Sequence, residues 1–315
     1  MASSWKKSAA LLLVLIVGGI YAYKAEYLAA KKKEEAERGE KKLFSFDEKS
    51  VTGLSVTSED GKIEVVRDKD AWRITSPISA DGDPAAIGGV ITAALDASYT
   101  ESVDGNPRDF GLEPAWTRID FHLGEKSVAL LVGSTSPTGA SAYVKTDGKI
   151  LLVPVSLARG VRKNLFQLRE KRFFAGTTSE ISKFEIWRGK TQISVEKDAG
   201  GRWGVTNPAK SEADDGAVHD LLSALVHTRA VAFADDKSDA ETGLKNPAAK
   251  VSIWNKSAAQ TLLLGDETND KLGTYARLEG GKTTAVIPAN FVRGLPQTAR
   301  ELEPKKNDAE QKDHK

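Results

Sequence analysis

The four histidines are the side chains of this sequence best suited to proton transfer or metal binding. His219 and His227 fall within one expected helix, eight positions apart. Two residues of one helix bind the same metal ion when they are about three or four positions apart. His122 lies in an expected strand, and His314 lies in a polar tail. The absence of cysteine also excludes thiolate nucleophiles, disulfides and cysteine-containing zinc sites. We therefore predict no metal and no cofactor.

Hydroxyl groups gather after Gly133, where Ser134 and Thr135 open a polar loop. A serine nucleophile of the hydrolase type needs a G-x-S-x-G turn followed directly by a helix, and this stretch has neither signal. A matching loop farther along the chain starts with Gly265 and Asp266 and contains no serine. The pattern favours a hairpin connection over a nucleophile.

Four aspartates, Asp81, Asp83, Asp214 and Asp215, are candidates for paired acid and base catalysis. All four stand where helices are expected to begin. A carboxylate at that place accepts hydrogen bonds from free N–H groups and complements the helix dipole. We predict capping roles, no catalytic residues and a protein that is not an enzyme, while an enzyme that uses Asp, Glu or Ser without a recognisable motif remains the alternative.

The elements that would position these residues occur twice along the chain, at an offset of about 131 residues. Residues 72–77 (WRITSP) match residues 203–208 (WGVTNP), and residues 130–133 (LLVG) match residues 262–265 (LLLG). Glycine-leucine turns, tyrosines and Val-Pro or Ile-Pro pairs also recur in the same order. The body of the chain is therefore predicted to be a tandem duplication.

Each repeat starts with three short runs that alternate apolar and polar residues, which is typical of a β-meander. A helix is expected next, near Asp83 and Asp214, followed by another strand at residues 98–103 or 229–234. Further strands and a short amphipathic helix complete each repeat. The fold class is predicted to be α+β, with two tandem repeats that each pack a mainly antiparallel sheet against one main helix and a short terminal helix, after an N-terminal transmembrane helix.

Residues 9–22 contain no charge and follow two lysines near the amino terminus. A membrane-spanning helix needs about 20 apolar residues, and flanking aromatics such as Trp5 and Tyr21 can extend this run at the interfaces. We interpret residues 1–28 as an uncleaved signal anchor. A cleaved signal peptide is the alternative, although no A-x-A cleavage site ends the run.

The charges around this segment leave its orientation open. Lys and Arg are more numerous after it than before it, which by simple counting would hold the body in the cytoplasm. A very short amino-terminal tail commonly stays inside, and we therefore place the body outside. The mixed charges of residues 29–42 predict a solvated stalk, and contact of Lys31, Lys32 and Lys33 with anionic lipid is the alternative.

Composition limits the remaining possibilities. The chain of 315 residues is long enough for about two domains, which we place at residues 43–172 and 173–303, with a polar tail at 304–315. With 45 basic and 44 acidic residues, the net charge is +1, so no broad positive field favours nucleic acid as a partner.

The turn at residues 111–114 (GLEP), the strand ending in residues 130–133 and the Val153-Pro154 pair resemble the bacterial family called domain of unknown function 4340. The second repeat carries similar signals at Gly243-Leu244 and Ile287-Pro288. The resemblance implies a membrane-anchored chain with an extracytoplasmic domain. Some members are found beside components similar to the gliding-motility ABC transporter, which implies an accessory role, and the family brings no catalytic residues.

These observations together predict a non-enzymatic interaction module in the inner membrane, single-pass, with its carboxy-terminal body in the periplasm. Its expected partners are the membrane and other envelope or transporter proteins, in an ABC-transporter-like or motility assembly. The alternative is a periplasmic protein that binds a ligand or glycan in a cleft between the repeats, with Trp116 and Trp254 as probes. The candidate partner-contact residues lie in polar loops and are Ser134, Thr135, Asp266, Glu267 and Asn269.

Overall fold

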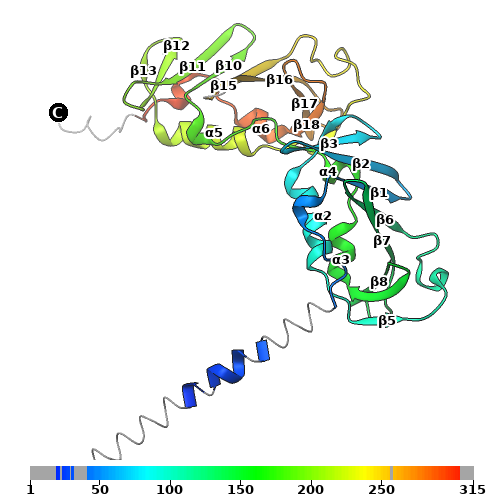
Figure 1. Cartoon of the computed structure of the whole chain (residues 1–315). Coiled ribbons are helices and arrows are strands. Elements are labelled where there is room, and N and C mark those ends of the chain that lie inside the picture. The colour runs from blue at the N-terminus through cyan, green and yellow to red at the C-terminus, as the bar shows by residue number, and fades with distance from the viewer. Residues whose placement is uncertain (1–18, 22, 29, 32–40, 256–257, 306–315) are drawn as a thin grey trace, which may run out of the picture. The chain divides into compact units, whose positions relative to one another are not determined.

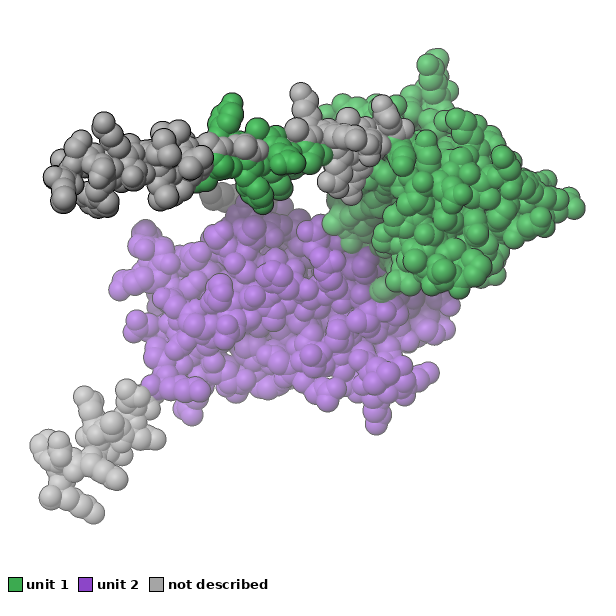
Figure 2. Space-filling model, turned by 90° about the horizontal axis from the view of Figure 1, so that it is seen from below, with its two compact units in different colours: residues 1–169 green, residues 170–315 purple. Residues whose placement is uncertain are grey.

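The computed structural model describes residues 19–21, 23–28, 30–31, 41–255 and 258–305. Contacts divide the chain into two compact units, with unit 1 ending at Arg169 and unit 2 beginning at Glu170 (Figure 2). The sequence pattern placed this boundary between residues 172 and 173.

Unit 1 is built on one antiparallel sheet of nine strands, in the order β4-β3-β2-β1-β6-β7-β8-β9-β5. Apolar and polar residues alternate along its strands, as in β3, where Trp72 and Ile74 are buried and their neighbours are not. One face of the sheet therefore belongs to the core and the other is polar. The strands are β1 (Gly53–Ser58), β2 (Gly61–Asp68), β3 (Ala71–Ser76), β4 (Ala80–Asp81), β5 (Glu101–Val103), β6 (Thr117–Leu123), β7 (Lys126–Thr135), β8 (Ser141–Thr146) and β9 (Lys149–Pro154).

Residues 41–169 form three α-helices, and the two longer ones cover one face of the sheet (Figure 1). The longest helix, α2 (Pro84–Asp96), buries Ile87, Val90, Ile91 and Ala94, which recur at spacings of three and four and so form one stripe. The other helices are α3 (Val155–Val161) and α4 (Leu165–Leu168), and 3₁₀ turns occur at η1 (Glu48–Ser50) and η2 (Pro107–Phe110).

Unit 2 repeats this architecture with a second antiparallel nine-stranded sheet, in the order β13-β12-β11-β10-β15-β16-β17-β18-β14. Its main helix, α5 (Asp215–His227), packs Val218, Leu221, Leu222 and Leu225 into the core. The other elements are β10 (Lys183–Arg188), β11 (Thr191–Lys197), β12 (Trp203–Asn207), β13 (Ser211–Glu212), β14 (Ala232–Phe233), β15 (Ala249–Trp254), β16 (Ala259–Glu267), β17 (Gly273–Leu278), β18 (Ala285–Pro288), α6 (Ala289–Gly294), η3 (Thr178–Glu180) and η4 (Ala299–Leu302).

Matching hydrogen bonds join matching elements in the two units. The Asp83 N–H donates to the Leu168 carbonyl at 2.8 Å, which ties the start of α2 to the end of α4. In unit 2 the Asp214 N–H donates to the Leu302 carbonyl, also at 2.8 Å, at the start of α5. The same strand order and the same closing contact therefore occur in both units, as expected for an α+β architecture built twice.

The sheet edges are shorter than the sequence pattern predicted. The strand expected at residues 98–103 is confined to β5, and the strand expected at 229–234 is confined to β14. Two further strands of two residues each, β4 and β13, form the opposite edges. Short edge strands expose few unpaired backbone groups, so they limit edge-to-edge association.

No helix within the described ranges combines the length and the apolar character needed to cross a membrane. Most of the predicted anchor, residues 1–28, lies outside those ranges, since residues 1–18 and 22 are not described. The same holds for most of the predicted stalk and of the polar tail, including His314.

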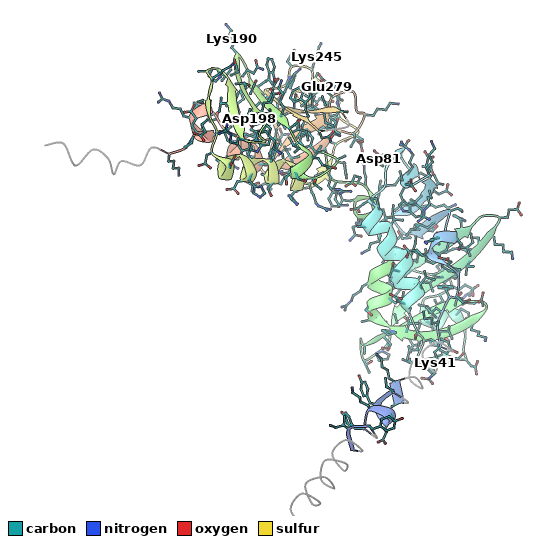
Figure 3. All side chains as sticks on the ribbon, turned by 60° about the vertical axis from the view of Figure 1, so that its left-hand side comes forward. Lys41, Asp81, Lys190, Asp198, Lys245 and Glu279 are labelled. Carbon is teal, nitrogen blue, oxygen red and sulfur yellow. The ribbon has the colours of Figure 1, made fainter. Side chains whose placement is uncertain are left out.

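Two of the four aspartates cap helices, as predicted. Asp83 accepts hydrogen bonds from the N–H groups of Ala85 and Ala86 at 3.0 and 3.1 Å, and Asp214 accepts one from Ala217 at 2.8 Å. Asp81, labelled in Figure 3, does not cap a helix, because it lies on β4. Its carboxylate forms an ion pair with Arg73 at 3.1 Å.

Replacement of Asp214 by alanine is expected to lower the free energy of unfolding of unit 2 by about 1 kcal/mol, because the Ala217 N–H loses its acceptor. Asp214→Asn should retain most of the stability, since its amide oxygen still accepts. The matched control is Asp215→Ala, an exposed change at the first helical residue, which should cost no more than about 0.5 kcal/mol. Urea denaturation of the full chain measures all three variants. Equal losses for the Asp214 and Asp215 alanine variants would contradict the capping role.

Candidate functional site

A hollow of about 1060 Å³ opens on unit 1 where the end of β1, the turn into β6 and the link between α3 and α4 meet. We call this hollow the unit 1 groove. Ser58 and Glu59 contribute from the end of β1, and Trp116 contributes from the turn. Arg162 and Lys163 contribute from the link between the helices. Residues far apart in the sequence therefore meet at one concave surface.

The side chains of Trp116 and Arg162 both line the groove and lie against each other. Trp116 is 54% exposed, which is unusual for so large an apolar side chain. The guanidinium carbon of Arg162 lies 5.3 Å from the centre of the tryptophan ring, within the range of a cation–π interaction. Arg162 Nη2 also donates a hydrogen bond to the Gly133 carbonyl at 2.6 Å. The ring and the guanidinium together form a partly apolar, positively charged platform.

Local helix signals fix the position of Arg162 and Lys163. The Arg162 N–H donates to the Ala158 carbonyl at 3.2 Å, which closes the last turn of α3. Asn164 and Gln167 then form a reciprocal capping box, with bonds of 2.9 and 3.0 Å, that starts α4 immediately afterwards. The two basic residues therefore stand on a short link held at both ends.

The basic side chains of the groove differ in how their charge is balanced. Arg118 pairs with Asp120 at 2.7 Å, and the hydrogen bond and charge of Asp120 raise the pKa of Arg118. Arg162 and Lys163 are half-buried, and within the described part of the chain neither forms an ion pair with a carboxylate. Burial lowers the pKa of the Arg162 guanidinium, because desolvation disfavours its charged form. An anionic group in the groove would compensate this desolvated charge.

Residues 72–247 match the sequence profile of a family described as a domain of unknown function, DUF4340. The match covers more than half of the 315 residues. The chain belongs to this family. Comparisons with curated proteins and with solved structures find no match to it. Trp116, Arg162 and Lys163 lie within the matched part of this DUF4340 protein, whereas Ser58 and Glu59 precede it.

The contact residues predicted from the sequence are not the residues that form the groove. Ser134 and Thr135 are the last residues of β7, and Asp266 and Glu267 are the last residues of β16, so these strands extend into the expected loops. Ser134 is half-buried and its hydroxyl donates to the Phe110 carbonyl at 3.0 Å. The other predicted residues, Thr135, Asp266, Glu267 and Asn269, are exposed, and Asn269 lies in the turn after β16.

The tryptophans considered as probes have different surroundings in this DUF4340 protein. Trp72, in contrast to the two probes Trp116 and Trp254, is 6% exposed and belongs to the core. Trp254 lies under the ammonium group of Lys183, at 4.6 Å from the ring centre. Trp116 is the probe that lines the unit 1 groove. Its proximity to Arg162 could not be read from the sequence, because no local motif joins the two positions.

The three histidines within the described ranges lie on the surface or on the polar sheet face. His219 and His227 are exposed on α5, and His227 Nδ1 lies 2.8 Å from the Ser223 carbonyl in the last turn. His122 Nε2 lies 3.0 Å from the hydroxyl of Ser55, but this serine is only 3% exposed. In the described ranges, no group of three or more His, Asp or Glu side chains is arranged to hold a metal ion.

Proposed function

We propose that this DUF4340 protein is a membrane-anchored, non-enzymatic interaction module that binds a partner protein through the unit 1 groove. The observation that carries the proposal is the exposed Trp116 ring with the Arg162 guanidinium stacked on it. Tryptophan and arginine are enriched among the residues that dominate binding energy at protein interfaces. The position of both side chains at a concave surface supports their use as a docking point.

The cellular setting of the proposal comes from the sequence. The uncharged residues 9–22 support a single-pass anchor in the inner membrane, and the family resemblance supports a body on the periplasmic side. Family resemblance supports an accessory role in an ABC-transporter-like or motility assembly of the cell envelope. A partner reached by unit 1 would then be another envelope or transporter protein.

A photo-crosslinking amino acid at position 116, introduced into the full chain in cells, tests the docking role. We expect one dominant crosslinked product at position 116, because that side chain lines the groove. The matched control places the same amino acid at Glu125, an exposed residue in the β6–β7 turn that does not line the groove. Equal product patterns at the two positions, or no product at position 116, would contradict the proposed function.

The same experiment includes positions 135 and 269, the exposed ends of the loops predicted as contacts. A dominant product at either position with none at 116 would move the docking surface from the groove to those loops. Reporter fusions after Glu303, one active in the periplasm and one active in the cytoplasm, test the orientation separately.

A further inference from the structure

The two units differ at the equivalent of the unit 1 groove. Strands β1 and β10 are equivalent, and their last residues are Ser58 and Arg188. Ser58 pairs with Thr117 and Arg188 pairs with Ala249, so these partners are equivalent too. The residue before each partner is Trp116 in unit 1 and Ala248 in unit 2. Unit 1 therefore has a small side chain and a tryptophan where unit 2 has an arginine and an alanine.

In unit 2 the Arg188 side chain reaches the end of α6, and its two terminal nitrogens have three acceptors, whereas its Nε, like that of Arg162, has none among the described residues. Its Nη2 donates to the Val292 carbonyl at 2.8 Å and to the Leu295 carbonyl at 3.5 Å. Its Nη1 donates to Gln297 Oε1 at 3.2 Å. Unit 2 thus fills the space beside the end of α6 with its own guanidinium.

In unit 1 the groove contains the guanidinium of Arg162, the residue that ends α3, and its one hydrogen-bond acceptor among the described residues is the Gly133 carbonyl. On one side of the Arg162 guanidinium lies the Trp116 ring instead of a further hydrogen-bond acceptor. Lys163, also half-buried, adds a second cation without a carboxylate partner in the described ranges. Ser58 lines the groove, and its short side chain cannot reach the helix end as Arg188 does in unit 2.

An unpaired, half-buried cation attracts an anion more strongly than an exposed one, since less water screens the interaction. A carboxylate matches the fork of a guanidinium, with two oxygens for two N–H groups. The hollow, at about 1060 Å³, exceeds the volume of one carboxylate side chain and reaches the upper end of small-molecule pockets. Room therefore remains for the neighbouring residues of a peptide.

We propose that the unit 1 groove binds an acidic segment of a partner protein. An Asp or Glu carboxylate of the segment accepts hydrogen bonds from Arg162 and Lys163, and the apolar atoms next to it pack on Trp116. This inference rests on the proposed function and names the chemistry of its partner. The carboxylates that also line the groove, Glu59, Asp60 and Glu113, are exposed to water. They repel densely charged polyanions and so favour a segment with isolated acidic residues.

The test uses the full chain in mild detergent, labelled with 5-fluorotryptophan so that each of its 6 tryptophans gives a fluorine NMR signal. The Trp116 signal is assigned from Trp116→Phe. The probes are the tripeptide acetyl-Leu-Glu-Leu-amide, its Gln counterpart, and acetyl-Leu-Leu with a free terminal carboxylate. We expect the Trp116 signal to shift saturably with the Glu probe and the Gln probe to bind about tenfold more weakly. Stronger binding by the terminal carboxylate would assign the site to a chain end and overturn the acidic-side-chain proposal.

Variants locate the interaction. Arg162→Gln should weaken binding of the Glu probe about tenfold, and Lys163→Gln should weaken it as well without removing any hydrogen bond that holds the fold. Glu113→Gln should bind equally or more tightly, because a repulsive charge is removed. The matched control is Arg188→Gln, which removes a half-buried arginine of unit 2 outside the groove and should leave probe binding unchanged. Circular dichroism confirms that each variant is folded.

Equal binding of the Glu and Gln probes, or full binding by both Arg162→Gln and Lys163→Gln, would overturn this inference. So would a Trp116 signal that stays unshifted up to about 20 mM probe. If crosslinking at position 116 succeeds while these results are negative, the groove docks a partner of different chemistry and the proposed function stands. If the probe binds as expected and no crosslinked product forms in cells, the carboxylate site stands and the docking role fails.

Discussion

Replacement of Gly265 by alanine is expected to unfold unit 2 or to reduce its free energy of unfolding by about 3 kcal/mol or more. A Cβ atom at this position would overlap the carbonyl oxygen of Thr242, and a backbone atom has no alternative rotamer to adopt. The Asp266 N–H donates to the same carbonyl at 2.9 Å, so the close approach of β16 to this turn is also held by a hydrogen bond. Relief of the overlap would break that bond.

The matched control is Gly294→Ala, at the end of α6 in the same unit. Nothing lies within 4 Å of a Cβ built at Gly294, and alanine is favoured over glycine in a helix by about 0.5–1 kcal/mol. We expect this variant to be as stable as the natural chain or slightly more stable. Hydrogen exchange with mass spectrometry on the full chain resolves the effect by unit. Equal protection of unit 2 in the two variants would show that the contact between β16 and Thr242 adjusts to the extra Cβ atom with no loss of stability.

The same contact exists in unit 1 and explains a repeated sequence motif. A Cβ at Gly133 would overlap the Phe110 carbonyl, just as one at Gly265 would overlap that of Thr242. These two glycines end the LLVG and LLLG segments that first indicated the repeat. The sequence shows that the glycine recurs, and the structure shows that a strand crossing closely over a turn requires it.

Local signals account for most of the elements that the sequence predicted. Alternation of apolar and polar residues located the first three strands of each unit, because one sheet face is buried and the other is polar. Asp83 and Asp214 located the starts of α2 and α5, since capping depends on residues two or three positions away. These interactions span few residues, and so their patterns are visible in the chain itself.

The edges of the sheets and the groove depend on contacts between distant residues. Asp81 was predicted to cap a helix, yet its partner is Arg73 on the neighbouring strand, and only the pairing of β3 with β4 brings the two together. Arg162 reaches the carbonyl of Gly133, a residue 29 positions earlier. No spacing rule reports such a contact, because it depends on how α3 lies against the sheet.

The sequence contains the difference between the two units at the end of β1 and β10, but it does not show what this difference does. Ser58 and Arg188 occupy equivalent strand ends, and an alignment of the repeats places them together. A serine in place of an arginine at a strand end is an ordinary surface change unless the space beside it is known. Only the hydrogen bonds of Arg188 to the end of α6 show what unit 1 lacks.

The second large effect is expected in the aromatic cluster of unit 1. Phe121 on β6 is fully buried, and its ring centre lies 5.8 Å from that of Phe44 and 5.5 Å from that of Phe46. Phe121→Ala should therefore reduce the free energy of unfolding of unit 1 by about 3–5 kcal/mol, through lost burial and the cavity that remains. Val66→Ala on β2, where the valine is 40% exposed, is the matched control and should cost less than about 1 kcal/mol.

Phe121→Ala should also change where unit 1 first opens. Phe44 and Phe46 belong to the segment that follows the predicted stalk, and the Leu43 N–H holds this segment by a bond of 3.1 Å to the Ala97 carbonyl. Loss of the Phe121 ring removes the aromatic surface on which both phenylalanines rest. Amide exchange at residues 43–46 should then accelerate more than exchange in β7. Uniform acceleration across unit 1 would contradict a local docking role for the cluster.

Under the proposed function this cluster is the connection between the membrane-proximal stalk and the unit that carries the groove, so its loss should also reduce crosslinking at position 116.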